Sequence, residues 1–202
     1  MSEKPEEKAR EKIDEMLNSA GWDVQNLKNA SIHINQGVAI REFPLSSGHG
    51  FADYLLYVDG KATGVIEAKK AGTTLSGVEI QSDKYKKGLP EILPAWFRPL
   101  PFCYQTTGVE TRFTNGFDPE SRSRNVFSFH RPSTMAQWLR EGVSVPDKKA
   151  ADVSPPLFTK PSTLLSRLRQ LPPLIQEGLW SAQIKAIRNL EKSLAENRPR
   201  SL

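Results

Sequence analysis

The stretch ADYLLYVDGKATGVIEAKKAG, residues 52–72, predicts a β-hairpin in which two apolar runs flank an Asp-Gly turn centred near Gly60. Asp53, Glu67 and Lys69 nevertheless fall within the two runs, although strand interiors usually exclude these residue types. The hairpin therefore carries two carboxylates and an ammonium group where a plain core element would carry apolar side chains.

Strand geometry predicts where these charges lie. Side chains alternate between the two faces of a strand, so Glu67 and Lys69 point the same way, and a turn near Gly60 places Asp53 roughly opposite Glu67. Directly opposed residues have Cβ atoms about 5 Å apart, and two carboxylates that close repel each other unless a cation lies between them. Carboxylate and carbonyl oxygens with waters suit Mg²⁺, and the backbone carbonyl of Ala68 is a further candidate ligand.

These groups suit the hydrolysis of a phosphodiester bond. That reaction needs an activated water, a cation at the scissile phosphate and stabilisation of developing charge, and Lys69 would hold or polarise the metal-bound water. A surface salt bridge among the three charges is the alternative, because a D…ExK pattern is loose. The apolar runs YLLYV and GVI favour a central hairpin over an exposed edge, where burying like charges is costly.

The segment after the hairpin predicts a helix over 78–89. Gln81 and Tyr85 are four residues apart, so they share one face, and a helix packed beside the hairpin would direct both to the same site. A helix surface pair is the alternative. Residues 61–88 carry six lysines against three acids, which suits a phosphate backbone or a solvated lysine-rich face.

The composition predicts one globular core with an appendage. The 202 residues are 38% hydrophobic and 25% charged, with no apolar run of membrane-spanning length and no signal-peptide core, so we expect a cytoplasmic protein with no membrane partner. A net charge of +5 is compatible with a polyanionic partner. The lone cysteine, Cys103, excludes an internal disulfide framework, and with three histidines it disfavours a structural zinc site.

Periodicity and turn residues predict the remaining elements. We expect helices over 5–20 (stopping at Gly21), 133–142 (with Ser133 as N-cap) and 174–197, and strands over 38–45, 51–58, 63–69, 101–108, 109–115 and 121–130. Residues 143–173 hold six of the fifteen prolines, which predicts a linker or irregular strap.

One set of residues resembles a known motif: Asp53, Glu67-Ala68-Lys69 and Gln81-x-x-x-Tyr85 are similar to the PD-(D/E)xK nuclease motif with the QxxxY addition of RecB-like members. The longer stretch REFPLSSGHGFADYLLYVDGKATGVIEAKKAG (41–72) resembles the N-terminal nuclease domain of the restriction (R) subunit of type I restriction-modification enzymes, as do TRFTN (111–115) and SRNVFSFHRPSTMAQWL (123–139). The resemblance implies an α/β (α+β) fold with a restriction-endonuclease-like core, that is, a central mixed sheet flanked by helices.

The resemblance also implies roles for these residues. Asp53, Glu67 and the carbonyl of Ala68 would bind Mg²⁺, Lys69 would assist the attacking water or the phosphate, and Gln81 and Tyr85 would position DNA. Ala52 stands where the motif has Pro, a common departure. Many members add an acid from the first helix, for which the candidates here are Glu7, Glu11, Asp14 and Glu15.

The same resemblance implies the context of the reaction. Duplex DNA would be cut after ATP-driven translocation by the full-length subunit, in a complex with modification (methyltransferase) and specificity subunits. LWSAQIKAIRNLEKSLAENRPRSL (179–202) is similar to the segment before the phosphate-binding loop of a superfamily 2 motor, in which Gln183 would contact adenine; an ordinary amphipathic helix is the alternative. No GxxxxGK[ST] motif occurs, so we expect ATP to bind only the full-length subunit. The implied domains are 1–142 (nuclease), 143–173 (strap) and 174–202 (entry to the motor).

Two other functions compete with this interpretation. A non-catalytic module that binds DNA, or docks the motor onto the modification and specificity subunits, would explain the basic balance and the Pro-rich strap. A carboxylate-pair glycosidase would leave Lys69 without a role. Arg41 and Glu42 either lie near DNA or form a pair at a strand end, and His49 is either a loop residue or a catalytic base.

Overall fold

The computed structural model describes residues 5–46, 48–75, 88–118, 121–141 and 173–196. These residues divide between two compact units, of which the larger holds residues up to Gly116 together with Ser121–Arg140. The smaller unit includes the C-terminal helix. None of the helices in these ranges combines the length and the apolar composition needed to cross a membrane.

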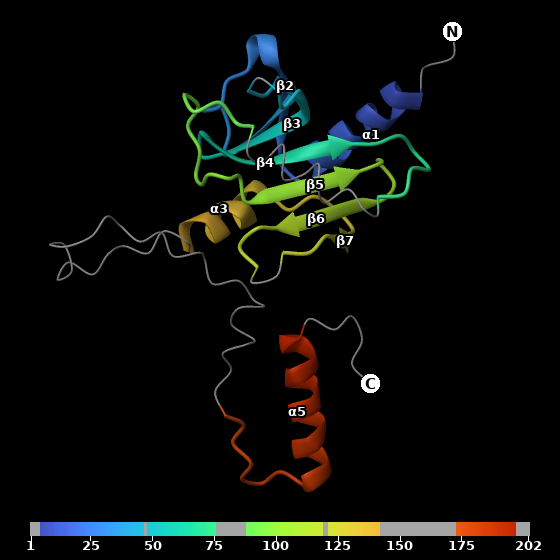
Figure 1. The fold of residues 1–202 in the computed structure, drawn as a ribbon, viewed down its shortest axis with the longest axis vertical. Coiled ribbons are helices and arrows are strands. Elements are labelled where there is room, and N and C mark those ends of the chain that lie inside the picture. The colour runs from blue at the N-terminus through green and yellow to red at the C-terminus, as the bar shows by residue number, and fades with distance from the viewer. Residues whose placement is uncertain (1–4, 47, 76–87, 119–120, 142–172, 197–202) are drawn as a thin grey trace, which may run out of the picture. The chain divides into compact units, whose positions relative to one another are not determined.

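Within the described residues, three α-helices and seven strands make up the regular structure (Figure 1). The helices are α1 (Pro5–Ser19), α3 (Pro132–Glu141) and α5 (Ser181–Ala195), with a short 3₁₀ turn at Leu27–Asn29. The strands are β1 (Asp23–Asn26), β2 (Gly37–Pro44), β3 (Phe51–Val58), β4 (Lys61–Ala68), β5 (Phe102–Thr106), β6 (Thr111–Asn115) and β7 (Arg124–Val126).

The strands form one mixed sheet in the order β1-β2-β3-β4-β5-β6-β7. β1 pairs with β2 and β4 pairs with β5 in parallel, whereas the other four pairs are antiparallel. Parallel neighbours need a long connection, and the chain between β4 and β5 provides one. A mixed sheet flanked by helices confirms the predicted fold class.

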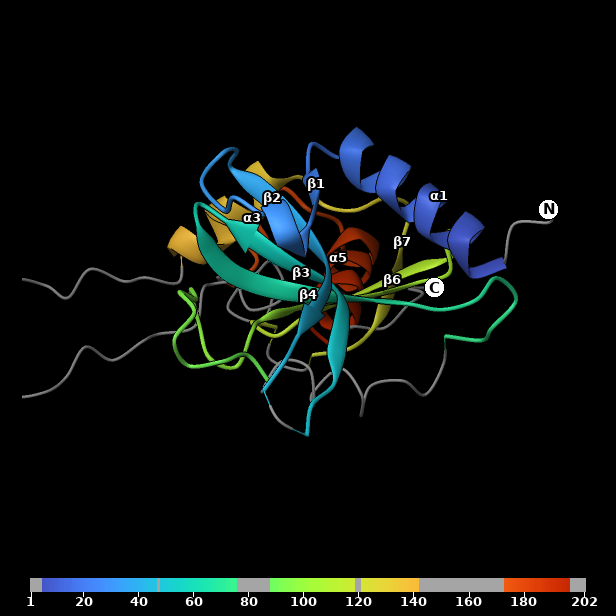
Figure 2. The same cartoon turned by 90° about the horizontal axis from the view of Figure 1, so that it is seen from above.

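The helices α1 and α3 cover one face of this sheet. Tyr54 of β3 and Tyr104 of β5 share that face because both pair with the same residue of β4. The hydroxyl of Tyr54 donates a hydrogen bond of 2.8 Å to Asp14 of α1. Phe113, the register partner of Tyr104, has its ring centroid 6.1 Å from that of Trp138 in α3. In Figure 2 both helices lie along this side of the strands.

The opposite face is packed against the connection between β4 and β5. Leu55, Val65 and Cys103 are register partners on this face, and Leu89 and Leu100 from the connection cluster with them. All five are at most 3% exposed. Fully burying a side chain of this size contributes about 1.5–3 kcal/mol, so this layer fixes the strands whose ends carry the predicted charges.

The end of α1 shows why the chain turns where the sequence predicts. Gly21 has a φ of +90°, a conformation that favours glycine. Its N–H donates to Asn18 (2.9 Å), and the N–H of Trp22 donates to Leu17 (3.0 Å). This is the Schellman arrangement, which satisfies the last carbonyls of a helix.

A β-bulge in β4 sets the register of the central hairpin. Tyr57 pairs with Ala62, whereas Leu56 pairs with Gly64, so Thr63 is an extra residue on β4. A two-residue turn without this bulge would place Asp53 level with residue 66 and turn residue 67 to the other face. With the bulge, the register that ends at Tyr54 and Ile66 continues to Asp53 and Glu67, which are therefore level. The sequence predicts this level position, but the structure reaches it by a two-residue turn and one inserted residue.

Several element boundaries differ from the expectations. Lys69 lies just beyond β4 instead of inside it, α3 begins at Pro132 so that Ser133 is not its N-cap, and β1 was not anticipated. The predicted helix over 78–89, apart from its last two residues, and nearly all of the 143–173 strap lie outside the described residues. The start of α3 at Pro132 has a physical reason, because proline is favoured at the first position of a helix, where its missing N–H costs nothing.

The smaller unit contains α5, which is shorter than predicted. It begins at Ser181, and the seven residues before it are not helical. The side-chain oxygen of Gln183 accepts a 2.9 Å hydrogen bond from the backbone N–H of Trp180, which fixes the start of the helix. Gln183 thus has a structural role here, and its predicted contact with adenine stays a prediction.

We expect Thr63→Val to stabilise the larger unit. Thr63 is fully buried, and its hydroxyl has no hydrogen-bond partner among the described residues. Replacing it with an isosteric methyl group removes an unsatisfied polar atom, worth about 1–3 kcal/mol when buried, and keeps the β-branched shape. Urea unfolding measures the gain. Thr63→Ser, which keeps the hydroxyl and loses the methyl, serves as the control and should destabilise. A loss of stability in Thr63→Val would contradict this account.

Candidate functional site

Asp53 lies at the start of β3 with one carboxylate oxygen held by the backbone. Its Oδ2 accepts a 2.9 Å hydrogen bond from the N–H of Ala68, the last residue of β4. Its Oδ1 lies 4.0 Å from the Arg10 guanidinium, and the side chain is 32% exposed. Burial raises the pKa of Asp53 above its ordinary value, while the Ala68 hydrogen bond, Arg10 and Lys69 act in the opposite direction.

Glu67 is buried near the end of β4 and is paired with Lys69. The residue is 4% exposed, and its Oε1 lies 2.6 Å from the Lys69 ammonium. Its other oxygen, Oε2, has no hydrogen-bond partner among the described residues. A buried carboxylate oxygen without a partner is costly, so this atom is available to a cation.

The two carboxylates lie at the neighbouring ends of β3 and β4, because Asp53 precedes Tyr54 and Glu67 follows Ile66, the register partner of Tyr54. Asp53 lies beside Arg10 of α1, whereas Glu67 lies beside Lys69. The ammonium of Lys69 bonds to Glu67 and also lowers the pKa of Asp53. Lys69 therefore pairs with Glu67 and also acts at longer range on Asp53, while the predicted divalent cation stays a prediction.

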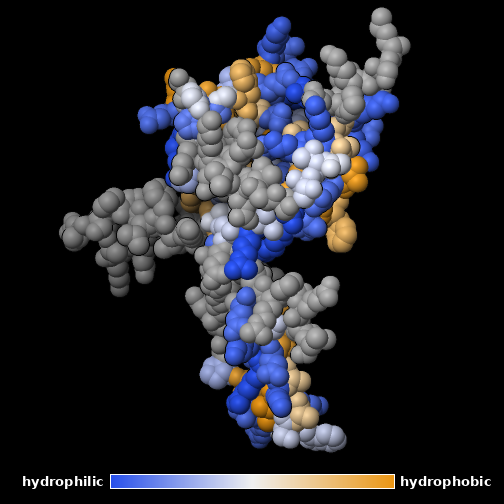
Figure 3. Space-filling model, turned by 45° about the vertical axis from the view of Figure 1, so that its right-hand side comes forward, coloured by the Kyte–Doolittle hydropathy of each residue, from blue (hydrophilic) through white to orange (hydrophobic). Residues whose placement is uncertain are grey.

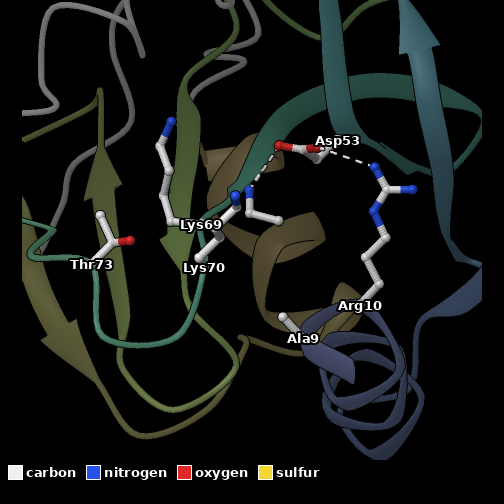
Figure 4. A pocket seen from close by; sticks show the side chains of 7 residues that line it. Ala9, Arg10, Asp53, Lys69, Lys70 and Thr73 are labelled. Atoms are coloured by element: carbon white, nitrogen blue, oxygen red, sulfur yellow. Dashed lines mark hydrogen bonds and ion pairs between the residues drawn. The ribbon is translucent and has the colours of Figure 1, made fainter. Parts of the chain in front are cut away.

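A cavity of about 410 Å³ opens beside Asp53. Figure 4 shows the Asp53 carboxylate between the backbone of β4 and the Arg10 guanidinium, with Lys69 and Lys70 across the opening. The remaining lining residues are Ala9, Ala68 and Thr73. Three basic side chains and a threonine hydroxyl around one carboxylate make a cavity suited to an anionic ligand that is accompanied by a cation.

Arg10 of α1 and Glu42 of β2 complete the charges around Asp53. Arg10 forms an ion pair and hydrogen bond with Glu42. The pairs Arg41–Tyr54 and Phe43–Ala52 flank Glu42, so it is level with Asp53 on the neighbouring strand. Its φ of +49° is unusual for a residue other than glycine and is typical of functional or strained positions.

The first helix contributes a cation to Asp53 where the resemblance leads us to expect an acid. Asp14 is engaged elsewhere, since it accepts hydrogen bonds from Arg41 (2.8 Å) and from the hydroxyl of Tyr54 (2.8 Å). Arg41 is thereby tied to this helix and not to the cavity, and Asp14 raises its pKa. Among the described residues, no group of three or more acidic, histidine or cysteine side chains has the geometry of a metal site.

Sequence reasoning missed several residues of the site. Arg10 and Thr73 give no local signal, because only the packing of α1 and the loop after β4 brings them to Asp53. Gln105 of β5 is the register partner of Glu67 and is 4% exposed; its sequence signal is a glutamine within an apolar strand. Gln81 and Tyr85 lie outside the described residues, so their roles stay predictions.

The residues present fit a small, hard divalent cation. Mg²⁺ takes one or two protein carboxylates and keeps several waters, and Asp53 and Glu67 provide two. The observation that supports the fit is the Oε2 of Glu67, which is buried and has no hydrogen-bond partner in the described part of the chain. The N–H of Ala68 already points to Asp53, and the carbonyl of a strand residue lies on the same edge as its N–H, which makes the Ala68 carbonyl a candidate third ligand.

Known proteins with similar sequences are subunits of restriction enzymes. Residues 23–97, which include β1 to β4 and all three predicted catalytic residues, match the family model of the second domain of the type I restriction enzyme EcoKI endonuclease subunit. The chain is 27% identical to the type I restriction enzyme EcoKI endonuclease subunit of Escherichia coli (strain K12) over 183 residues, covering 66% of this chain and 16% of that protein.

A solved structure has the same fold. It is described as a fragment of an HsdR subunit of a type I restriction enzyme from Vibrio vulnificus YJ016, with a TM-score of 0.51 and 18% sequence identity. The match covers 100% of this chain and 34% of that chain. The chain thus spans a minor part of each relative, and the comparisons relate it to the endonuclease (R) subunit of type I restriction enzymes.

The raised pKa of Asp53 predicts a pH-dependent effect of Asp53→Asn in the presence of a chelator. The unfolded chain loses this proton near pH 3.8 and the folded chain at higher pH, so the contribution of Asp53 to stability is present below pH 3.8 and is lost as the pH rises through the folded pKa. The asparagine does not titrate and still accepts from Ala68. Its stability relative to wild type should therefore increase between pH 3 and pH 7 in urea unfolding. A relative decrease would contradict the prediction.

Proposed function

We propose that this chain is the Mg²⁺-dependent DNA-cleaving domain of the R subunit of a type I restriction enzyme. The observation that carries the proposal is the placement of two carboxylates, Asp53 and Glu67, at the neighbouring ends of β3 and β4, with the Lys69 ammonium 2.6 Å from Glu67 and lining a basic cavity beside Asp53. The similarity to restriction endonuclease subunits supports it, because residues 23–97 contain all three of these residues.

Each residue has a role in phosphodiester hydrolysis under this proposal. When bound, the divalent cation supplies Lewis-acid chemistry and lowers the pKa of its water. Asp53 and Glu67, with the Ala68 carbonyl, would hold it. Lys69 would orient the attacking water or neutralise charge that develops on the phosphate. Gln81 and Tyr85 remain candidates for positioning the DNA.

The complete enzyme provides the setting of the reaction. We propose that the full-length subunit uses ATP to translocate duplex DNA, in a complex with modification and specificity subunits, and that this domain then cuts both strands. The hydrophilic surface over much of the face in Figure 3, interrupted by separate hydrophobic patches, is compatible with contacts to DNA and to other subunits. The match to a relative of which this chain covers 16% supports a role within a larger protein.

One observation favours the alternative of a non-catalytic DNA-binding or docking module. Arg10 lies beside Asp53, where it compensates the carboxylate without a metal. Under the alternative, the chain would bind DNA weakly and with a marked salt dependence, and divalent ions would not bind at Asp53. A metal titration separates the two functions.

Mg²⁺ is expected to stabilise the wild-type chain through Asp53 and Glu67. At a concentration 100 times the dissociation constant, binding to the folded state adds about 2.7 kcal/mol to the free energy of unfolding. Asp53→Asn and Glu67→Gln should lose most of this gain in thermal or urea unfolding with Mg²⁺, and Asp59→Asn, at the other end of the hairpin, should keep it. Equal stabilisation of all four proteins would point to non-specific binding and to the docking module.

In the complete enzyme, Lys69→Ala is expected to lower the rate of DNA cleavage by about 10²-fold or more, the usual contribution of a residue that assists proton transfer. Asp53→Ala should abolish cleavage. ATP hydrolysis should continue in both, because the motor lies outside this chain. Lys61→Ala, which removes a cation over Trp96 at the hairpin turn, is the matched control. Undiminished cutting by Lys69→Ala and Asp53→Ala would rule out the proposed site.

A further inference from the structure

Arg10 is placed to act on whatever enters the cavity beside Asp53. It reaches from α1 to the start of β3, and its guanidinium lies 4.0 Å from Asp53. It lines the same cavity as Lys69, Lys70 and Thr73. It therefore belongs to the site by position, although neither the nuclease motif nor its spacing includes it.

The present partners of Arg10 are held weakly enough to be exchanged. The Arg10 and Glu42 side chains are 46% and 62% exposed, and ion pairs between exposed side chains contribute little to stability. The second partner, Asp53, is beyond hydrogen-bond distance at 4.0 Å. The guanidinium can thus leave both carboxylates for a stronger partner at small cost.

A cation bound to Asp53 would change the balance of charge around Arg10. A divalent ion and a guanidinium repel each other when they share one carboxylate, so the ion weakens the contact with Asp53 and leaves Glu42 as the restraint. Glu42 has a left-handed backbone with φ +49°, and its carboxylate pairs with Arg10. Removing Glu42 would therefore leave Arg10 with Asp53 alone.

A phosphate is the partner that this arrangement fits. The guanidinium is planar, permanently charged and matches phosphate oxygens in a bidentate manner. Lys70 and the Thr73 hydroxyl lie across the same cavity, so a phosphodiester there would meet donors from two sides. A carboxylate ligand would fit less well than a phosphate, because the carboxylates of Asp53 and Glu42 already lie beside Arg10.

We propose that Arg10 is a DNA-positioning residue that exchanges Asp53 for a backbone phosphate next to the scissile bond when a divalent cation binds, with Glu42 as its resting partner. The inference rests on the proposed function, since it names a residue with which the same site would bind the DNA backbone. It makes Arg10 both a competitor of the cation and a ligand of the DNA.

The test measures two affinities in the same variant. The wild-type chain and Arg10→Gln are titrated with Ca²⁺ by calorimetry, and with a fluorescent duplex oligonucleotide in the presence of Ca²⁺ at several salt concentrations from low salt upward. Arg140→Gln is the matched control, because it also removes one exposed arginine from an ion pair, that with Asp59 (2.7 Å), at the other end of the hairpin.

Arg10→Gln is expected to change the two affinities in opposite directions. Ca²⁺ should bind about threefold more tightly or better, because a competing charge at short range is gone. The duplex should bind roughly tenfold more weakly, as for the loss of a hydrogen bond to a charged group. The slope of log affinity against log salt should fall by about 1, which marks one lost phosphate contact. Arg140→Gln should match wild type in Ca²⁺ affinity and in oligonucleotide affinity at the same salt to within about twofold, since it lies away from the cavity.

Glu42→Gln gives the complementary result. It should bind Ca²⁺ more weakly than wild type, because Arg10 then pairs with Asp53 alone, and this effect should shrink in the Arg10→Gln background. Unchanged duplex affinity in Arg10→Gln, or weaker Ca²⁺ binding in that variant, overturns the proposal. If Asp53→Asn binds Ca²⁺ as wild type does, the proposed nuclease function fails instead, and the duplex titration still decides whether Arg10 contacts phosphate.

Discussion

Asp53 and Glu67 lie level with each other because Thr63 is an extra residue in β4. A strand has a period of two, so one inserted residue decides which face every later side chain occupies. If the same residues paired in a regular ladder without the bulge, Glu67 would be level with Ala52 instead. The bulge leaves the Thr63 hydroxyl without a hydrogen-bond partner among the described residues, and it brings Glu67 level with the start of β3, where Asp53 lies.

With the two acids at the neighbouring ends of β3 and β4, the surrounding charges follow from electrostatics. Each carboxylate has its own cation, Arg10 for Asp53 and Lys69 for Glu67. Neither pairing is complete, since Arg10 stands 4.0 Å away and Glu67 keeps one oxygen without a described partner. An arrangement built only for stability would satisfy these groups or replace them with apolar residues. Incomplete satisfaction at a cavity mouth is typical of a site that awaits a ligand.

The central hairpin could be predicted from the sequence because its signals are local. Alternation, an Asp-Gly turn and charges at fixed spacing were enough to place Asp53 opposite Glu67. β1 could not be predicted, because four residues, Asp23–Asn26, are too few and too polar to show alternation; they form a strand only by pairing with β2. Arg10 and the backbone of Glu42 belong to tertiary packing, which a single sequence does not display. The sequence shows Gln105 as a polar residue in an apolar strand. It does not show that Gln105 lies next to Glu67, because parallel pairing joins segments that are distant in the sequence.

The central claim is that Asp53, Glu67 and the Ala68 carbonyl converge on one divalent cation. The most direct measurement is a crystal structure of this chain soaked with Mn²⁺, with data collected at the manganese absorption edge. The account predicts one anomalous peak bonded to both carboxylates at about 2.1 Å, close to the distance of Mg²⁺ ligands, with the Arg10 guanidinium moved away from Asp53. The absence of a peak there, or a peak bonded to Glu42 and not to Glu67, would contradict it.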